Sequence, residues 1–301
     1  MHNEHMPSIG IDGGGTGSRY TFRLSGDETI KAEGLPLQGS VMQAEEVARR
    51  IFGVIKNTLG DKASNVALLR AGIAGFASQD RSRALEQHLK KNLNRARVEI
   101  YSDVSTTFAA AFGTKTSGNA LLICGTGSVL ATGETNSRKI RLIGGSGPDT
   151  IEPGSGRQIG KDFLPFFESF SFADKLDLLN QYGLSTEKND TRMLQIFSER
   201  PSLLAPVCLN MAEKGDGTAE SITLNHINKT TELLHTAIAN NALVKKLALH
   251  GGLFDNSYFR EMMVHSLVKH HPEIHILNTP KNLTDLISRP EFSVPAVTQS
   301  D

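Results

Sequence analysis

The sequence is poor in the residues that build disulfide-bonded or cluster-binding proteins. Its 301 residues include two cysteines, Cys124 and Cys208, and no tryptophan. Two thiols exclude a disulfide-stapled scaffold, and they cannot supply the four thiolates of a zinc or iron–sulfur site within one chain. So few cysteines fit a reducing compartment, and we expect a cytoplasmic protein.

The chain also lacks a net charge and any long apolar run. Lys and Arg number 32 and so do Asp and Glu, which leaves no overall field to attract nucleic acid or an anionic membrane. No segment reaches the roughly eighteen apolar residues of a membrane-spanning helix, and the start shows no signal-peptide pattern. We therefore expect neither a nucleic acid nor a membrane as partner.

What the chain does contain is an ordinary globular mixture, with 39% hydrophobic residues and 28 glycines. Its length favours two domains. In the first part, apolar runs and turn residues predict three extended segments at 8–11, 19–24 and 29–33, with a turn at Gly26-Asp27. The periodicity then predicts a helix that stops near Gly60, a strand at 66–73, a helix at 81–93, a strand at 98–102 and a helix at 106–112.

The second part repeats this order. Gly15-Thr16-Gly17-Ser18 and Gly125-Thr126-Gly127-Ser128 are the same tetrapeptide, and each follows the first strand of its half. We infer a duplication, with one domain at 1–113 and a second at 114–301 that contains a helical insertion. Its predicted elements are strands at 120–124, 129–132 and 140–143, a helical segment at 154–241, a strand at 246–250, a helix at 259–269, a strand at 273–277 and a short helix at 283–287.

The first glycine loop has the composition of a phosphate-binding turn. In Asp12-Gly13-Gly14-Gly15-Thr16-Gly17-Ser18 the backbone N–H groups can approach a phosphate, and the Thr16 and Ser18 hydroxyls can donate to it. Asp12 could hold a magnesium ion. A tight hairpin with no ligand is the alternative interpretation.

The second loop favours the phosphate interpretation. Gly125, Thr126, Gly127 and Ser128 would supply a second set of donors, so that two hairpins hold the β- and γ-phosphates of one nucleotide in a cleft between the domains. Neither loop is a Walker A motif, because the lysine is missing. Neither is a Rossmann loop, because a strand and not a helix follows.

Asp103 is the candidate general base. It comes directly after the predicted strand at 98–102 and opens a helix, which places it at a strand end facing the cleft. A hydroxyl that attacks a γ-phosphate needs a carboxylate within reach to take its proton. The alternative is that Asp103 only caps its helix.

These motifs resemble those of the sugar kinase, Hsp70 and actin superfamily. Within it, the chain resembles the N-acetylglucosamine and glucosamine kinases of the BadF/BadG/BcrA/BcrD ATPase family. The resemblance implies an α/β fold of two duplicated ribonuclease-H-like domains of the actin and hexokinase type. It also implies that ATP and Mg²⁺ are bound, that Asp103 contacts the sugar 6-hydroxyl, and that Gly251 and Gly252 hold the adenosine.

The same resemblance suggests residues on the sugar side. Gly144-Gly145 and the segment from Glu152 to Gly160 resemble the family's sugar loop, although Glu152 stands where the family has aspartate. Gln38 and Gly75 resemble loop positions that contact the sugar, and a solvated loop residue is the alternative for Gln38. Ser146 replaces the tryptophan of many relatives. The family's C-terminal helix, which packs toward the first domain, is expected to be lost or degraded.

The resulting expectation is an ATP-dependent kinase that phosphorylates an amino sugar, N-acetylglucosamine or glucosamine, at a primary hydroxyl. The expected partners are that small molecule and a second copy of the chain in a homodimer. One alternative is the ATPase activator of 2-hydroxyacyl-CoA dehydratases, whose [4Fe–4S] cluster needs two cysteines per chain at a dimer face. The other is a sensor of the same fold without turnover. The histidines near residues 265–275 are interpreted as surface residues.

Overall fold

The chain forms a mixed α/β structure with two sheets. The structure, a computed structural model, describes residues 6–24, 28–134, 137, 139–144, 152–182, 184, 190–240 and 244–299. It divides into two compact units, one of residues 1–117, 133–141 and 278–301 and the other of residues 118–132 and 142–277. None of the described helices is long and apolar enough to cross a membrane.

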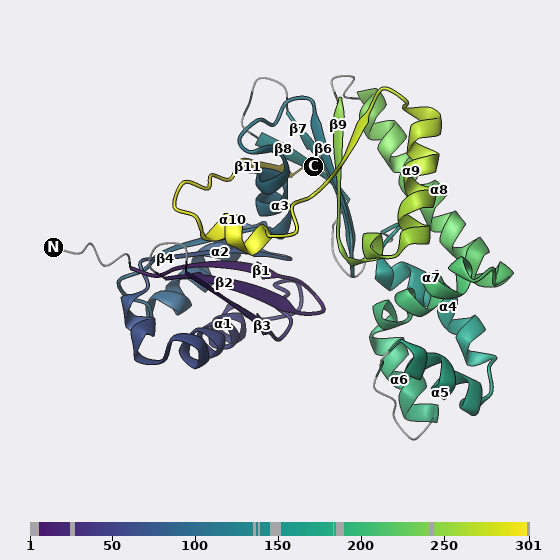
Figure 1. The fold of residues 1–301 in the computed structure, drawn as a ribbon, viewed down its shortest axis with the longest axis horizontal. Helices are drawn as coiled ribbons and strands as arrows, with labels where there is room; N and C mark the ends of the chain where they lie inside the picture. Colours follow the sequence, from purple (N-terminus) through teal and green to yellow (C-terminus); the bar gives the residue numbers. More distant parts are fainter. Residues whose placement is uncertain are drawn as a thin grey trace. The chain divides into compact units, whose positions relative to one another are not determined.

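The first sheet has the strand order β3-β2-β1-β4-β5 (Figure 1). β1 pairs antiparallel with β2 and parallel with β4, which pairs parallel with β5. The elements of this part are β1 (Ser8–Gly13), β2 (Ser18–Arg23), β3 (Thr29–Gly34), α1 (Ala44–Leu59), β4 (Leu68–Ile73), α2 (Gln79–Lys90), β5 (Arg97–Tyr101) and α3 (Asp103–Phe112), with a 3₁₀ turn at Gly60–Asn65.

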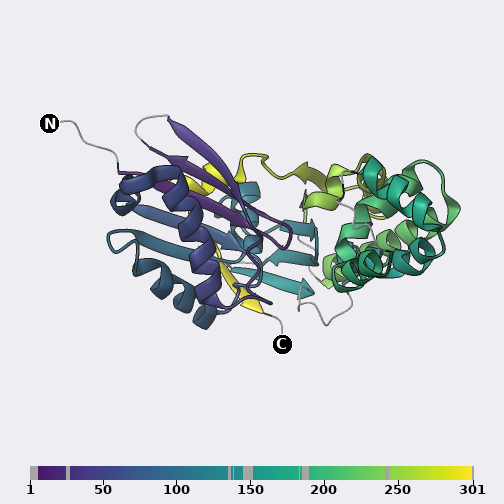
Figure 2. The ribbon, with the colours of Figure 1, turned by 90° about the horizontal axis from the view of Figure 1, so that it is seen from below.

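Helix α1 shows how the sequence produces these elements. Val47, Ile51, Ile55 and Leu59 recur on one face, and all four are buried in the core against the first sheet. The helix ends at Gly60, which has a φ of 57° and therefore a conformation that favours glycine. Figure 2 shows α1 lying along the first sheet. The predicted helix and its stop are confirmed.

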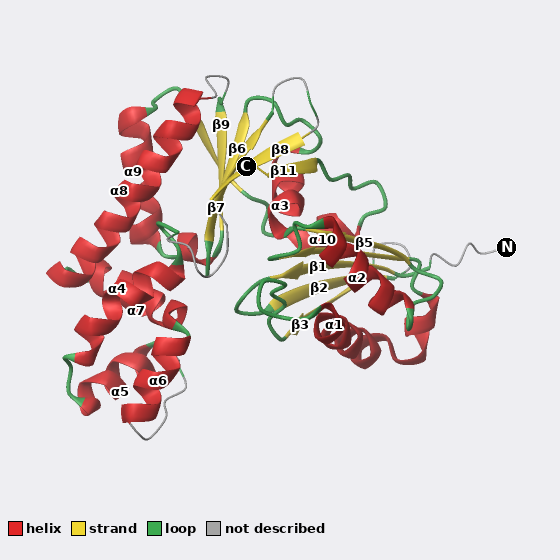
Figure 3. Ribbon diagram, turned by 180° about the vertical axis from the view of Figure 1, so that it is seen from behind, coloured by secondary structure: helices red, strands yellow, loops and turns green. Residues whose placement is uncertain are grey.

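The second sheet has the order β10-β9-β6-β7-β8-β11. Read in the opposite direction and without β11, this order is β8-β7-β6-β9-β10, which matches the first sheet with β6 in the place of β1. The topology supports the inferred duplication and confirms the predicted fold class. Figure 3 shows the long helices α8 and α9 beside β9. The elements are β6 (Asn119–Cys124), β7 (Ser128–Gly133), β8 (Lys139–Gly144), α4 (Gly156–Glu168), α5 (Phe172–Gln181), α6 (Asp190–Glu199), α7 (Ala205–Glu213), α8 (Gly217–Asn240), β9 (Lys246–His250), α9 (Ser257–His270), β10 (His275–Asn278), α10 (Leu283–Ser288) and β11 (Ala296–Gln299), with 3₁₀ turns at Pro201–Leu204 and Gly252–Asp255.

The predicted short helix at 283–287 is confirmed as α10. Helix α10 forms and packs on β1 and β2 of the first unit (Figure 1). It approaches so closely that a Cβ at Gly10 would collide with the Thr284 carbonyl and the Ser288 amide. Strand β11 was not expected at all. The predicted boundary between residues 113 and 114 stays a prediction, and the predicted turn at Gly26-Asp27 lies outside the described residues.

Candidate functional site

In the first unit the candidate residues gather at the carboxyl edge of three parallel strands. Asp12 is next to the end of β1 and pairs in register with Gly72 on β4, which pairs with Tyr101 at the end of β5. Asp103 follows that strand by two residues. A Cβ at Gly72 would collide with Thr106 of α3, so glycine lets this helix pack closely on the strand end. The two aspartates therefore share one edge of the sheet.

Asp103 is held at the start of α3 without being its cap. Ser102 is the N-cap, and its Oγ accepts the Ser105 N–H at 3.2 Å. Asp103 is half-buried, and its Oδ1 accepts the adjacent Val104 N–H at 2.9 Å. The pKa of the Asp103 carboxyl is raised to about 6, mainly because the group is buried; the Val104 N–H opposes this shift and the nearby Asp12 carboxylate adds to it. Such a carboxyl exchanges a proton near neutral pH.

Asp12 is the residue predicted to hold magnesium. Burial raises the pKa of its carboxyl, and Arg19, its partner across the strand pair with β2, lowers it. Two neighbouring carboxylates in a partly buried place favour a cation between or beside them. Among the described residues, no three side chains of His, Cys, Asp or Glu converge on a possible metal position.

The first glycine loop is a tight turn between β1 and β2. The Gly14 N–H donates to the Gly17 carbonyl at 2.9 Å, and Thr16 is exposed at the tip. Ser18 lies differently from the expectation. It is buried, and its hydroxyl donates to the Leu35 carbonyl at 2.7 Å. The structure therefore does not bring the Ser18 hydroxyl to the open side of the loop, and its role toward phosphate stays a prediction.

A second loop of the first unit brings Gln38 and Gly75 to the same edge. Gln38 forms an isolated parallel bridge with Ala74, and the Leu37 N–H donates to the Gly14 carbonyl at 3.0 Å. Gly75 has a φ of 81°, and a Cβ there would collide with the Ser40 amide. Sequence reasoning missed Arg81, whose guanidinium donates to the Gly39 carbonyl at 2.6 Å and fixes this loop from outside.

In the second unit the other glycine loop lies between β6 and β7. The Gly156 N–H at the start of α4 donates to the Gly125 carbonyl at 2.7 Å, and the Arg157 N–H donates to the Thr126 carbonyl at 3.1 Å. Gly251 follows β9, the parallel neighbour of β6, with a φ of 108°. A Cβ at Gly251 would collide with the Cys124 carbonyl. The loop, the glycine turn and the start of α4 thus share one edge of this sheet.

Glu152 lies in the turn 152–156, which contacts the second glycine loop, and was expected to face a sugar. It is 7% exposed, and its Oε2 accepts the Ser128 N–H at 3.1 Å. A Cβ at Gly127 would stand only 2.8 Å from the same oxygen. The Ser128 hydroxyl donates to the Pro153 carbonyl at 2.7 Å. One backbone N–H of the loop that was predicted to hold phosphate therefore donates to a carboxylate, which shows that the loop can bind an anionic group at this point.

Some predicted residues do not enter this geometry. Gly145 and Ser146 lie outside the described residues. Gly252 is exposed after β9, and its contact with adenosine stays a prediction. The histidines interpreted as surface residues are exposed at positions 265, 270 and 275, whereas His271 is partly buried and its Nε2 lies 2.9 Å from Nδ1 of His235.

The sequence matches one family over most of its length. The model of the BadF/BadG/BcrA/BcrD ATPase family aligns with residues 9–285. No curated protein matches by sequence.

Solved structures share the fold at low identity. A protein from Porphyromonas gingivalis, provisionally assigned as an N-acetylglucosamine kinase, is 18% identical with a TM-score of 0.70, and the match covers 93% of this chain and 97% of the other. A protein from Chromobacterium violaceum with the same provisional assignment is 19% identical with a TM-score of 0.64, over 93% and 98%. A ROK family glucokinase from Streptomyces griseus, solved with glucose and AMPPNP, is 16% identical with a TM-score of 0.58, over 90% and 94%. These likenesses show the fold.

Proposed function

Because the chain belongs to the BadF/BadG/BcrA/BcrD ATPase family, we propose that it is an ATP-dependent kinase that phosphorylates an amino sugar, N-acetylglucosamine or glucosamine, at a primary hydroxyl. The observation that carries the proposal is Asp103. It is a partly buried carboxylate with a pKa near 6, placed at a strand end beside a second aspartate and a glycine loop.

Each residue has a part in this reaction. Asp103 accepts the proton of the sugar hydroxyl. The oxygen of that hydroxyl forms a bond to the γ-phosphorus, and the bond between the γ-phosphorus and the bridging oxygen of ADP breaks. Asp12 would hold a magnesium ion, which neutralises charge on the phosphates when bound. The glycine loops orient the phosphates through backbone N–H groups.

The sugar-side assignments extend this proposal. Gln38 and Gly75 lie on loops beside the Asp12 edge, where they can contact the sugar ring or its substituent. Gly251 and Gly252 would hold the adenosine, as in the family the chain resembles. The identity of the sugar is part of the proposal, since relatives provisionally assigned to N-acetylglucosamine are only 18% and 19% identical.

The positions of the two cysteines argue against the alternative function of an ATPase activator that shares an iron–sulfur cluster. Cys124 and Cys208 are both free and fully buried, each within the core of the second unit. Burial raises the pKa of the Cys124 thiol far above its usual range and that of Cys208 to about 12. Thiols enclosed in the core of one unit are not available at a surface where two chains would share a cluster.

A coupled ADP-release assay against amino sugars and their N-acetyl forms tests the kinase. We expect turnover with at least one of them that depends on Mg²⁺ and is lost in Asp103→Asn. Glucose and the sugar-free enzyme serve as controls. If calorimetry shows sugar binding but no sugar gives ADP release above the sugar-free rate, the kinase proposal is wrong and the sensor interpretation replaces it.

A further inference from the structure

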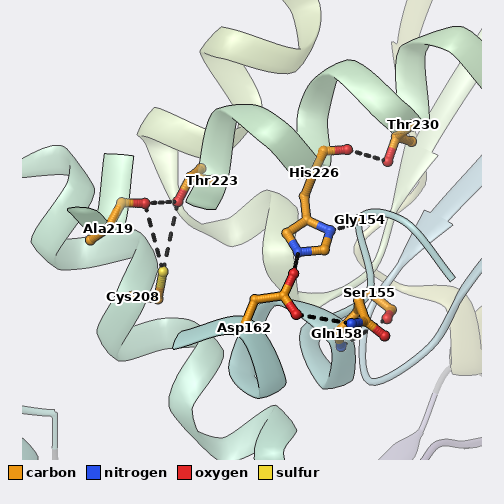
Figure 4. A network of polar contacts seen from close by, with 9 residues as sticks. All are labelled: Gly154, Ser155, Gln158, Asp162, Cys208, Ala219, Thr223, His226 and Thr230. Carbon is orange, nitrogen blue, oxygen red and sulfur yellow. Dashed lines mark hydrogen bonds and ion pairs between the residues drawn. The ribbon is translucent and has the colours of Figure 1, made fainter. Parts of the chain in front are cut away.

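A buried histidine lies behind the turn that contacts the second glycine loop (Figure 4). His226 on α8 is 1% exposed. Its Nε2 lies 3.0 Å from Oδ2 of Asp162 on α4, and its Nδ1 accepts the Gly154 N–H at 3.5 Å. Neither His226 nor Asp162 belongs to a motif of the site, and the two join both helices to the turn 152–156.

These contacts fix the form of the imidazole. A backbone N–H can only donate, so Nδ1 must be the acceptor, and the single proton of a neutral ring lies on Nε2 and is donated to Asp162. Gln158 holds the other oxygen of this carboxylate, since its Nε2 donates to Oδ1 at 3.0 Å. The neutral Nε2–H tautomer is therefore the one that fits both neighbours.

The turn 152–156 packs closely on helix α8 at Gly154. Gly154 has a φ of 72°, and a Cβ there would stand 2.5 Å from Oγ1 of Thr230, one helical turn after His226. The Thr230 hydroxyl itself donates to the His226 carbonyl at 2.7 Å (Figure 4). The backbone of the turn thus rests directly on α8, which points the Gly154 N–H at the ring.

The other side of the same turn holds the second glycine loop. Glu152 and Pro153 accept hydrogen bonds from Ser128, as described above, and the Ser155 N–H donates to the Glu152 carbonyl at 3.1 Å. Ser155 then caps α4. The Gly154 N–H and the Pro153 carbonyl belong to one peptide group, so a change at the Gly154 amide acts directly on the carbonyl that accepts the Ser128 hydroxyl.

We propose that His226 is a positioning residue: its neutral form holds the turn 152–156 against the second glycine loop, and its protonation releases that turn. A protonated ring carries N–H on both nitrogens, so Nδ1–H would face the Gly154 N–H. Two buried donors in contact cost more than one long hydrogen bond contributes. The link to catalysis rests on the proposed function, in which this loop holds phosphate.

The surroundings of His226 decide the pH at which this happens. Asp162 on α4 favours the protonated imidazole, and Lys229 on α8 disfavours it. The turn presents only a backbone N–H to the ring, and α7 contributes the uncharged thiol of Cys208 to the same region. Helix α9 contacts α8 next to His226 through Met263 and Ser266 at Thr231, and its titratable contacts lie further along α8, where Tyr258 donates to Glu220 and His270 lies against His235. Burial dominates and lowers the pKa of His226 below its usual 6.5, so the release belongs to acid pH.

Two substitutions separate the two contacts of the ring. In His226→Asn the amide oxygen can take the place of Nδ1 and accept the Gly154 N–H, without a proton to titrate. In His226→Gln the longer amide can still donate to Asp162, but Gly154 loses its acceptor. A side chain that only fills space would tolerate both in the same way, so the pair distinguishes positioning from packing.

Hydrogen exchange of the amides at 152–158, corrected for the intrinsic rate, is the measurement, at pH 7.5 and pH 5. We expect protection in the wild type to fall about fivefold or more at pH 5, the effect of losing one hydrogen bond. His226→Asn should stay protected at both values, and His226→Gln should be unprotected at both. ATP affinity measured by calorimetry at the same pH values should follow the same order.

Equal protection in the two variants, or a wild-type pH response that survives in His226→Asn, would overturn the proposal. If both variants fail to fold, Asp162→Asn is the second test. It removes the negative charge that favours the protonated imidazole, so protection should be lost at a lower pH than in the wild type. If the pH of half-maximal protection is unchanged, the proposal is also overturned. The exchange measurement needs neither ATP nor sugar. It can therefore succeed although no sugar is phosphorylated, and it can fail although the kinase is active.

Discussion

The two glycine loops have the same four residues but different neighbours. In the first unit, Gly15-Thr16-Gly17-Ser18 lies beside two aspartates with raised pKa values. In the second, Gly125-Thr126-Gly127-Ser128 is held by the start of α4 and by the Glu152 carboxylate. The serine hydroxyls show the same difference, since Ser18 donates to the Leu35 carbonyl and Ser128 to that of Pro153. The repeated tetrapeptide thus forms two different turns, since Gly13 pairs with Ser18 around the first and Cys124 pairs with Ser128 around the second. The chain around each turn determines which groups contact it.

The largest effect should come from the acidic side. Asp103→Asn keeps the size of the side chain but removes the base, and we expect kcat to fall at least about a hundredfold, because losing a general base typically costs 10²–10⁴. ADP release in single-turnover conditions measures it. Asp80→Asn, an exposed acid in the first turn of α2, is the control. Turnover within threefold of the wild type would remove Asp103 from the reaction.

Asp12→Asn should act on the nucleotide and not on the sugar. We expect the affinity for ATP in the presence of Mg²⁺ to fall about tenfold or more, because a carboxylate ligand of the ion is lost. Sugar binding without Mg²⁺ should change less than twofold. Calorimetry with and without EDTA gives both values. Equal losses for the two ligands would mean that Asp12 only supports the turn.

Glu152→Gln sharpens the contrast between the loops. The amide oxygen can still accept the Ser128 N–H, but the negative charge beside the predicted phosphate position is gone. We expect ATP to bind about fivefold more tightly, the equivalent of roughly 1 kcal/mol of like-charge repulsion. The KM for sugar should stay the same. A higher KM for sugar with unchanged ATP affinity would instead return Glu152 to the sugar side.

The smallest effect concerns stability. The Asp103 carboxyl has a pKa of about 6 in the folded chain against 3.8 as its ordinary value, so the folded state binds the proton more tightly. Its contribution to stability is complete below pH 4 and is lost as the pH rises through 6. Asp103→Asn should therefore raise the Tm at pH 8, by about 2–6 °C for about 1–2 kcal/mol, and have little effect at pH 4. A Tm that falls at pH 8 would contradict the assigned burial.

Much of the fold could be predicted from local patterns. The apolar stripe of α1 and the repeated tetrapeptide gave the helix, the duplication and the carboxyl edge that joins Asp12 to Asp103. What could not be predicted depends on contacts distant in sequence. Glu152 faces the second loop because of how its turn packs on α8, and the Ser18 hydroxyl finds the carbonyl of Leu35. Helix α10 was predicted as a short helix, but its position on β1 and β2 could not be predicted, because it depends on contacts between the two ends of the chain.

Helix α10 has a consequence for how the chain is made. Leu283 and Ile287 are buried, and Arg70 on β4 donates to the carbonyls of Ile287 and Arg289. The face of β1 that carries Gly10 is covered only by residues about 270 positions later. The ribosome therefore synthesises the second unit before α10 can cover this part of the first sheet, and a nascent chain exposes that face until residues 283–288 emerge.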